Sequence, residues 1–153
     1  MSADESALTP QNWPLAQLPG LSLRDQQLLQ RAGLTTTLQL WQLTQDTLLI
    51  ETLAARLLIP QRQLLKWISL ADLARVPAVG CTYSGLLLHV GIQSVEQLSQ
   101  SSPAQLHQHL LRLQVMMMRR RDLCPSASQV VRWIHEAQRL PVQPSPQSRK
   151  GSA

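Results

Sequence analysis

The stretch Leu18-Pro19-Gly20-Leu21-Ser22 recurs 58 positions later in the chain as Val76-Pro77-Ala78-Val79-Gly80. A second pair of matching segments, Leu64-Leu65-Lys66-Trp67-Ile68 and Val130-Val131-Arg132-Trp133-Ile134, lies at a spacing of 66. Because the spacings differ by eight, the second copy carries extra residues, in the stretch that holds residues 116–121. An internal repeat defines the building unit of a fold. Here the unit is a pair of helices around a Pro/Gly hairpin, and we name residues 18–22 the first hairpin and residues 76–80 the second hairpin.

The composition of the 153 residues favours one compact, all-helical domain made of two similar halves. Leucine dominates the apolar residues, Phe is absent, and Val and Ile are sparse. Unbranched side chains lose little rotamer freedom on a helix, whereas β-branched ones suit strands. No apolar run approaches the roughly 18 residues of a membrane span. Residues 1–10 are acidic and polar, unlike a secretory signal, so we expect a cytoplasmic protein without membrane contact.

Capping and breaking residues divide the chain into about ten short helices, which we expect to stack as two repeats. Gly33 suits a left-handed C-terminal cap, Thr44 and Ser102 are candidate N-caps, and Ser126 or Ser128 caps the last helix. The helices predicted in this way include 24–32, 37–43, 45–58, 60–75, 104–115 and 126–137. We predict a first repeat over residues 13–69, a second over residues 70–140 that ends in a helix with Trp133, and disordered tails over residues 1–12 and 141–153.

Each repeat carries one tryptophan in a helical stripe. Leu64, Trp67 and Ile68 have the i, i+3, i+4 spacing of one helix face, and the stripe around Trp133 repeats it. Such a stripe is typical of core packing. A role in stacking a ligand is the alternative.

The second half resembles a known family. The segments 73–87, 90–92, 95–98 and 102–106, together with the closing helix 126–137, are similar to a bacterial tandem helix-hairpin-helix family, domain of unknown function 4332. The similarity is good over residues 70–140 and looser over residues 13–68. It implies an all-helical fold of helix-hairpin-helix repeats, and the family has no settled activity.

The wider helix-hairpin-helix class, which the hairpins also resemble, binds DNA without reading its sequence. The physical reason is that backbone N–H groups at a helix start attract a phosphate oxygen, while glycine permits the close approach. By this resemblance the candidate contacts are Gly20, Ser22, Arg24, Gly80, Thr82 and Ser84, with Gly80 expected to matter more than Gly20 because its half is more basic.

Each hairpin departs from that pattern. Ser22 replaces the second glycine of the first hairpin, and Ala78 replaces the first glycine of the second. No basic residue directly follows the second hairpin. The alternative interpretation is therefore that the hairpins only hold helices at a fixed angle.

The charge is uneven along the chain. Residues 1–58 carry three arginines and five acidic residues, whereas residues 59–153 carry eleven basic and four acidic residues. Arg119, Arg120 and Arg121, with Arg112 before them, form the densest basic cluster. This cluster is either a solvated loop or a contact for a polyanion or an acidic partner.

The sequence offers no pattern for catalysis, a cofactor or a metal. His107 and His109 point apart on a helix, and Cys81 and Cys124 have no ligand-spaced partner. Paired carboxylates, a nucleophile elbow and a phosphate loop are absent from the sequence. We therefore expect a non-enzymatic protein that binds nucleic acid weakly through phosphates. The alternative is a protein-interaction adaptor whose hairpins are purely structural.

Overall fold

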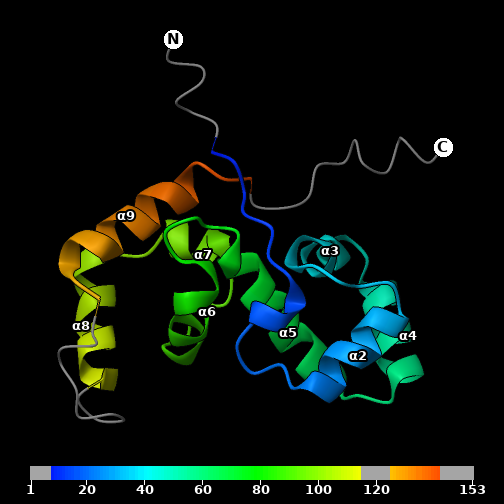
Figure 1. The fold of residues 1–153 in the computed structure, drawn as a ribbon. Coiled ribbons are helices and arrows are strands. Elements are labelled where there is room, and N and C mark those ends of the chain that lie inside the picture. The colour runs from blue at the N-terminus through cyan, green and yellow to red at the C-terminus, as the bar shows by residue number, and fades with distance from the viewer. Residues whose placement is uncertain (1–7, 115–124, 142–153) are drawn as a thin grey trace.

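The computed structural model describes residues 8–114 and 125–141, and the fold of these residues is all-helical, as the sequence predicts (Figure 1). The only extended pairing among them is an isolated bridge between Pro14 and Thr36. The described helices are two 3-10 helices, η1 (Leu15–Gln17) and η2 (Leu43–Gln45), and the α-helices α2 (Leu23–Arg31), α3 (Thr37–Gln42), α4 (Thr47–Leu57), α5 (Gln61–Ala74), α6 (Gly80–His89), α7 (Val95–Ser99), α8 (Pro103–Leu113) and α9 (Ala127–Gln138).

The helices follow the order that the repeat predicts. The series α2, α3, α4, α5 is matched in order by α6, α7, α8, α9, with starts offset by 56 to 58 residues for the first three pairs and by 66 for α5 and α9. In Figure 1, α5 crosses the middle of the molecule, with α2, α3 and α4 on one side and α6, α7, α8 and α9 on the other. The second hairpin joins α5 directly to α6, whereas the first hairpin joins only the short η1 to α2.

Equivalent caps begin the second α-helix of each half, α3 and α7. The Thr36 and Ser94 side chains accept hydrogen bonds from the backbone N–H of Gln39 and Gln97, at the starts of α3 and α7. The two glutamine side chains then accept backbone N–H groups just before their helices. At α3 this is a capping box, because Gln39 Oε1 also accepts the Thr36 N–H at 3.2 Å. Both arrangements satisfy donors that a helix start leaves free.

The N-cap predicted at Thr44 is wrong. Asp46 caps α4 instead, since its Oδ1 accepts the Leu49 N–H at 3.0 Å. The Thr44 hydroxyl donates back to the carbonyl oxygen of Trp41 at 2.8 Å, because η2 places a 3-10 turn between α3 and α4. Ser102 and Ser126 do cap α8 and α9.

The described residues form two hydrophobic cores, one in each half. Trp67 and Trp133 are each 1% exposed and lie in the first and second core respectively, which is the core packing that their stripes indicated. Leu70 and Ala74 of α5 still belong to the first core, and Val76 belongs to the second. The division therefore lies near the end of α5, a few residues after the predicted boundary at 69/70.

The segment before η1 is tied to both halves. Gln11 N–H donates to the Arg75 carbonyl oxygen at 2.9 Å, and Asn12 Oδ1 accepts the Leu38 N–H at 3.1 Å. Leu8 packs against the second core. Residues 8–12 are thus part of the folded structure, contrary to the predicted tail over residues 1–12. Residues 1–7 and 142–153 of the two predicted tails lie outside the described residues.

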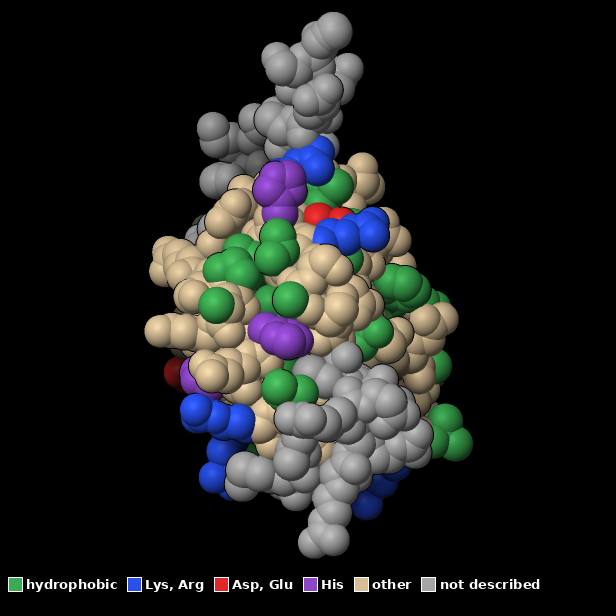
Figure 2. All heavy atoms as spheres, turned by 90° about the vertical axis from the view of Figure 1, so that its left-hand side faces the viewer, with side chains coloured by type: hydrophobic (Ala, Val, Ile, Leu, Met, Phe, Trp, Pro, Cys, Tyr) green, Lys and Arg blue, Asp and Glu red, His purple; other side chains and the backbone are tan. Residues whose placement is uncertain are grey.

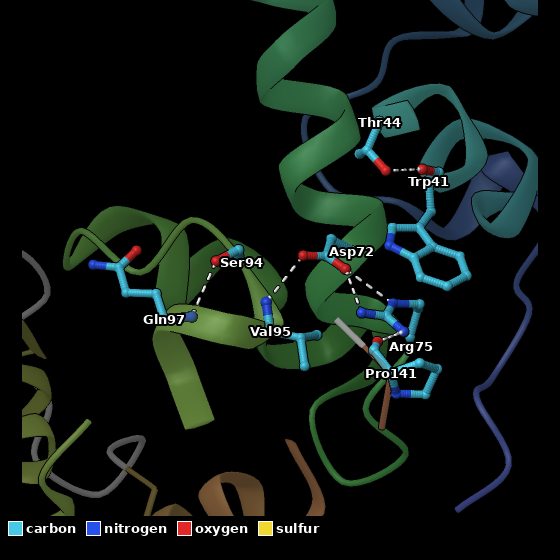
Figure 3. A network of polar contacts seen from close by, with 8 residues as sticks. All are labelled: Trp41, Thr44, Asp72, Arg75, Ser94, Val95, Gln97 and Pro141. Atoms are coloured by element: carbon cyan, nitrogen blue, oxygen red, sulfur yellow. Dashed lines mark hydrogen bonds and ion pairs between the residues drawn. The ribbon is translucent and has the colours of Figure 1, made fainter. Parts of the chain in front are cut away.

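A buried ion pair at the end of α5 holds the halves together (Figure 3). Arg75, 0% exposed, contacts Asp72 Oδ1 through Nη2 at 2.7 Å and donates to the Pro141 carbonyl oxygen through Nη1 at 2.8 Å. Its guanidinium lies 3.8 Å from the centre of the Trp41 ring, while Asp72 Oδ2 accepts the Val95 N–H at 2.9 Å. Burial raises the pKa of Asp72 and lowers the pKa of Arg75, and their mutual attraction opposes both shifts. We name this group the Asp72–Arg75 clasp.

Candidate nucleic-acid interface

The first hairpin presents an open glycine at the surface. Gly20 has φ +77°, a left-handed conformation that favours glycine. A Cβ atom built on it would meet no atom within 4 Å. Leu18 and Leu21 on either side are buried in the first core, which fixes the hairpin and leaves the Gly20 backbone exposed.

Gly20 lies at the edge of a pocket between the two halves. The pocket has a volume of about 320 Å³, and its lining comes from the first hairpin, α5 and α6: Pro19, Gly20, Lys66, Leu70, Gly85, Leu88 and His89. α6 packs directly against the first hairpin, since a Cβ built on Gly85 would lie 3.4 Å from Pro19 Cγ, an ordinary contact distance. The pocket is therefore lined by residues of both repeats.

Basic side chains extend from this pocket along α5. A second depression of about 430 Å³ shares Lys66 and Leu88 with the first and adds Arg62, Leu65, Ser69 and Gln93. Arg62 and Lys66 are exposed and lie one helical turn apart. We name the two depressions together the hairpin groove. Its polar groups include the Gly20 backbone, two cationic side chains and an imidazole, which together suit an anionic ligand.

Ser22 and Arg24 lie at the start of α2, a few residues after Gly20 in the sequence. Ser22 Oγ accepts the Asp25 N–H at 3.1 Å, so this hydroxyl caps the helix. Arg24 is exposed.

The second hairpin is closed. Gly80 also has a positive φ, +53°, but a Cβ built on it would lie 3.3 Å from Trp13 Cζ2. The Trp13 ring is fixed there, because its Nε1 donates to the carbonyl oxygen of Ala74 at 2.8 Å. Gly80 is buried and Ser84 is 0% exposed. The expectation that Gly80 is the leading contact is therefore corrected, and Ser84 has no surface on which to meet a ligand. Thr82 alone of this group is exposed.

A carboxylate of the chain already occupies the second hairpin. The Ala78 N–H donates to Glu136 Oε1 at 2.8 Å, and Glu136 Oε2 accepts from Arg132 Nε at 3.0 Å. Glu136 is 7% exposed. The two hairpins thus differ in surroundings as well as in backbone conformation, since the Ala78 φ is not positive, unlike that of Gly20.

The remaining predicted residues lie elsewhere. Arg112 is exposed in the last turn of α8, and Arg119, Arg120 and Arg121 lie outside the described residues. Figure 2 shows the face carrying α8 and α9, where described Lys and Arg side chains stand in separate groups and no continuous basic stripe forms. An apolar groove of about 550 Å³ lies between these helices, lined by Pro103, Ala104, His107, Gln108, Leu111, Ala127 and Val131.

Sequence reasoning missed Arg62, Lys66, His89, Gly85, Glu136 and Trp13. One signal was available for Lys66, because it aligns with Arg132 within the matched tryptophan segments. The contacts of Trp13 and Glu136 span 61 and 58 residues, and no local pattern marks them.

No metal cluster or membrane-spanning helix is found among residues 8–114 and 125–141. These residues include no group of three or more His, Cys, Asp and Glu side chains placed to hold a metal ion. None of their helices is both long enough and apolar enough to traverse a bilayer. Cys81 is a half-buried free thiol, and burial raises its pKa to about 11.

Comparison with known proteins identifies one family. Residues 19–140 match the family described as domain of unknown function (DUF4332). No curated protein and no solved structure matches the chain.

Proposed function

Since this chain belongs to the DUF4332 family, whose description assigns no function, we propose a role from the geometry of the hairpin groove. The protein binds nucleic acid without catalysis and without reading sequence, through phosphates placed in this groove. The observation that carries the proposal is the open Gly20 backbone at the edge of a pocket that also contains Lys66 and His89.

Each part of the groove supports one element of phosphate binding. A Cβ built on Gly20 would meet no atom within 4 Å, so a phosphate oxygen can come close to the chain there, just before the start of α2. Arg62 and Lys66 neutralise successive phosphates and release counterions. Phosphate contacts by themselves carry no sequence information, so binding of this kind does not read sequence.

Salt dependence of oligonucleotide binding tests the proposal. With Arg62 and Lys66 as the main cationic contacts, the logarithm of the affinity for single strands falls against the logarithm of salt with a slope of about −1.4. The double variant Arg62→Glu/Lys66→Glu should bind the oligonucleotide more weakly, and its affinity should depend less on salt. Arg31→Glu/Arg56→Glu is the matched control, because it changes the net charge equally at exposed helix ends away from the groove.

Comparing these two double variants shows whether oligonucleotide affinity depends on the groove or only on the net charge of the protein. Equal losses in both would mean that only total charge matters and that the groove is no site. No measurable binding by the unaltered protein at low salt would remove the proposal altogether. Thermal melts of each variant separate loss of binding from loss of folding.

The alternative is a protein-interaction adaptor, and the apolar groove between α8 and α9 favours it. Val131 within this groove is 50% exposed although it is hydrophobic. Val131→Asp should prevent co-purification of a protein partner on this face while leaving oligonucleotide affinity unchanged. Loss of oligonucleotide affinity in this variant would contradict the assignment of separate surfaces.

A further inference from the structure

The second hairpin shows how an anion is held in this fold. The Glu136 carboxylate accepts the Ala78 N–H with one oxygen and Arg132 Nε with the other. Arg132 and Glu136 lie one turn apart on α9, with the carboxylate buried and the guanidinium exposed at the surface. A backbone amide and a basic side chain thus share one internal anion. Charge-assisted hydrogen bonds of this kind are among the stronger ones in proteins.

The first repeat keeps two of these three groups. The repeat spacings place Gly20 at the position of Ala78, Lys66 at that of Arg132, and Leu70 at that of Glu136. The structure brings the three first-repeat residues together, since Gly20, Lys66 and Leu70 line the same pocket. The amide and the cation are therefore retained, while a leucine replaces the carboxylate.

The retained groups have no partner within the described part of the chain. No acceptor for the Gly20 N–H is found among the backbone or side-chain groups there, and Lys66 forms no ion pair with them. The pocket beside them is about 320 Å³, which exceeds the space that one carboxylate needs. His89 on α6 adds a further hydrogen-bonding group to its wall.

We propose that this pocket is a subsite for one phosphoryl oxyanion, which takes at Gly20 and Lys66 the place that the Glu136 carboxylate takes at Ala78 and Arg132. The inference deepens the proposed function and rests on it, because the phosphodiester of a nucleic acid is the ligand expected there. Free phosphate shares the same chemistry. The second repeat binds no external anion, since Glu136 already fills its position.

Amide resonances followed by NMR test the subsite directly. Titration with sodium phosphate, at ionic strength held constant with sodium chloride, should shift the Gly20 amide in a saturable way. The Ala78 amide should show no saturable shift. Gly33 and Gly91 are matched controls, because both have positive φ and open space beside them. A Gly20 shift no larger than those of Gly33 and Gly91 would overturn the proposal.

Exchanging equivalent residues between the two repeats tests whether their anion positions correspond. Leu70→Glu copies the second repeat and should abolish the saturable Gly20 shift, whereas the uncharged Leu70→Gln should keep it. Glu136→Leu copies the first repeat and should create a phosphate-dependent shift at Ala78. A Gly20 shift that persists in folded Leu70→Glu, or an Ala78 amide that stays unaffected in folded Glu136→Leu, would contradict the equivalence.

Leu70 is 2% exposed, so its charged variant can unfold. The surface variant Lys66→Gln keeps the test decisive, since it should weaken phosphate binding by about threefold or more, and Arg31→Gln should not. Equal affinities in these two variants would remove Lys66 from the subsite and overturn the proposal.

A thymidine oligonucleotide of eight residues, used as a second probe, distinguishes the nucleic-acid role from the phosphate subsite. Phosphate binding at Gly20 without oligonucleotide binding would sustain the subsite for free phosphate and refute the nucleic-acid role. Oligonucleotide binding that leaves the Gly20 amide unshifted would sustain nucleic-acid binding only at other residues and refute the subsite.

Discussion

Removing the positive charge from the Asp72–Arg75 clasp should destabilise the fold severely. Arg75→Met deletes the ion pair with Asp72, the hydrogen bond to the Pro141 carbonyl and the cation over the Trp41 ring. It leaves the Asp72 carboxylate, with a side chain only 9% exposed, supported by the Val95 N–H alone. Breaking a buried pair in this way costs about 3–5 kcal/mol. Since domains are stable by only about 5–15 kcal/mol, this is a large share of the total.

Urea unfolding at neutral pH measures the effect. For a slope near 2 kcal/mol/M, the expected loss lowers the midpoint by about 2 M. Arg132→Met is the matched control, because Arg132 also pairs with a carboxylate on its own helix, but its side chain is 71% exposed. Because the Arg132 guanidinium is exposed to water and only Glu136 is buried, losing Arg132 should cost less than losing Arg75, whose whole pair is buried. A loss in Arg75→Met no larger than in Arg132→Met would refute the reasoning.

The same variant should respond to pH in a defined direction. Burial raises the pKa of Asp72 and Arg75 opposes that shift, so removing Arg75 raises the pKa of Asp72 further. A carboxyl group whose pKa is raised by folding favours the folded state when protonated and disfavours it when ionised. The destabilisation relative to the unaltered protein should therefore shrink as pH falls through the pKa of Asp72 in the folded variant and on toward the ordinary carboxyl pKa. A deficit that grows on acidification would contradict this assignment.

Three further predictions concern single residues. With Cys124 replaced by Ser, alkylation of Cys81 should be slow at pH 8 and accelerate up to about pH 11, because burial raises the thiol pKa; a rate equal to that of free cysteine at pH 8 would contradict this. Leu58 has φ +58° and is 90% exposed, so Leu58→Gly should raise Tm by about 2–4 °C in a thermal melt, and a lower Tm would show that the leucine stabilises the fold. Gly80→Ala should cost more stability than Gly20→Ala in urea, because both strain the backbone but only Gly80 also meets Trp13; equal costs would mean that the Trp13 contact is loose.

The fold could be predicted from the sequence because its signals are local. The tryptophan stripes, the caps at Ser102 and Ser126 and the turn at Gly33 each depend on residues a few positions apart. The error at Thr44 has the same origin, since Thr44 and Asp46 are both good N-caps and η2 decides between them.

The candidate site could be predicted only in part. The sequence indicated that the hairpins matter, and the structure places Gly20 at an open pocket. The sequence could not indicate that Trp13 covers Gly80 or that Glu136 fills the second hairpin, because these contacts join segments far apart in the chain. The charge asymmetry favoured Gly80 as a contact. The structure instead buries Gly80 beneath the Trp13 indole, which leaves little of its backbone accessible to a ligand.

The central claim is that the first hairpin, and not the second, meets the phosphates of a nucleic acid. Fluorescence anisotropy with a labelled single-stranded oligonucleotide at low salt, comparing Gly20→Glu with Gly33→Glu, tests it most directly. Both glycines have positive φ and open surroundings, so both substitutions strain the backbone alike. A carboxylate at Gly20 should weaken binding by about tenfold or more, and one at Gly33 by less than about twofold. Equal affinities in the two variants, with unchanged melting temperatures, would contradict the account.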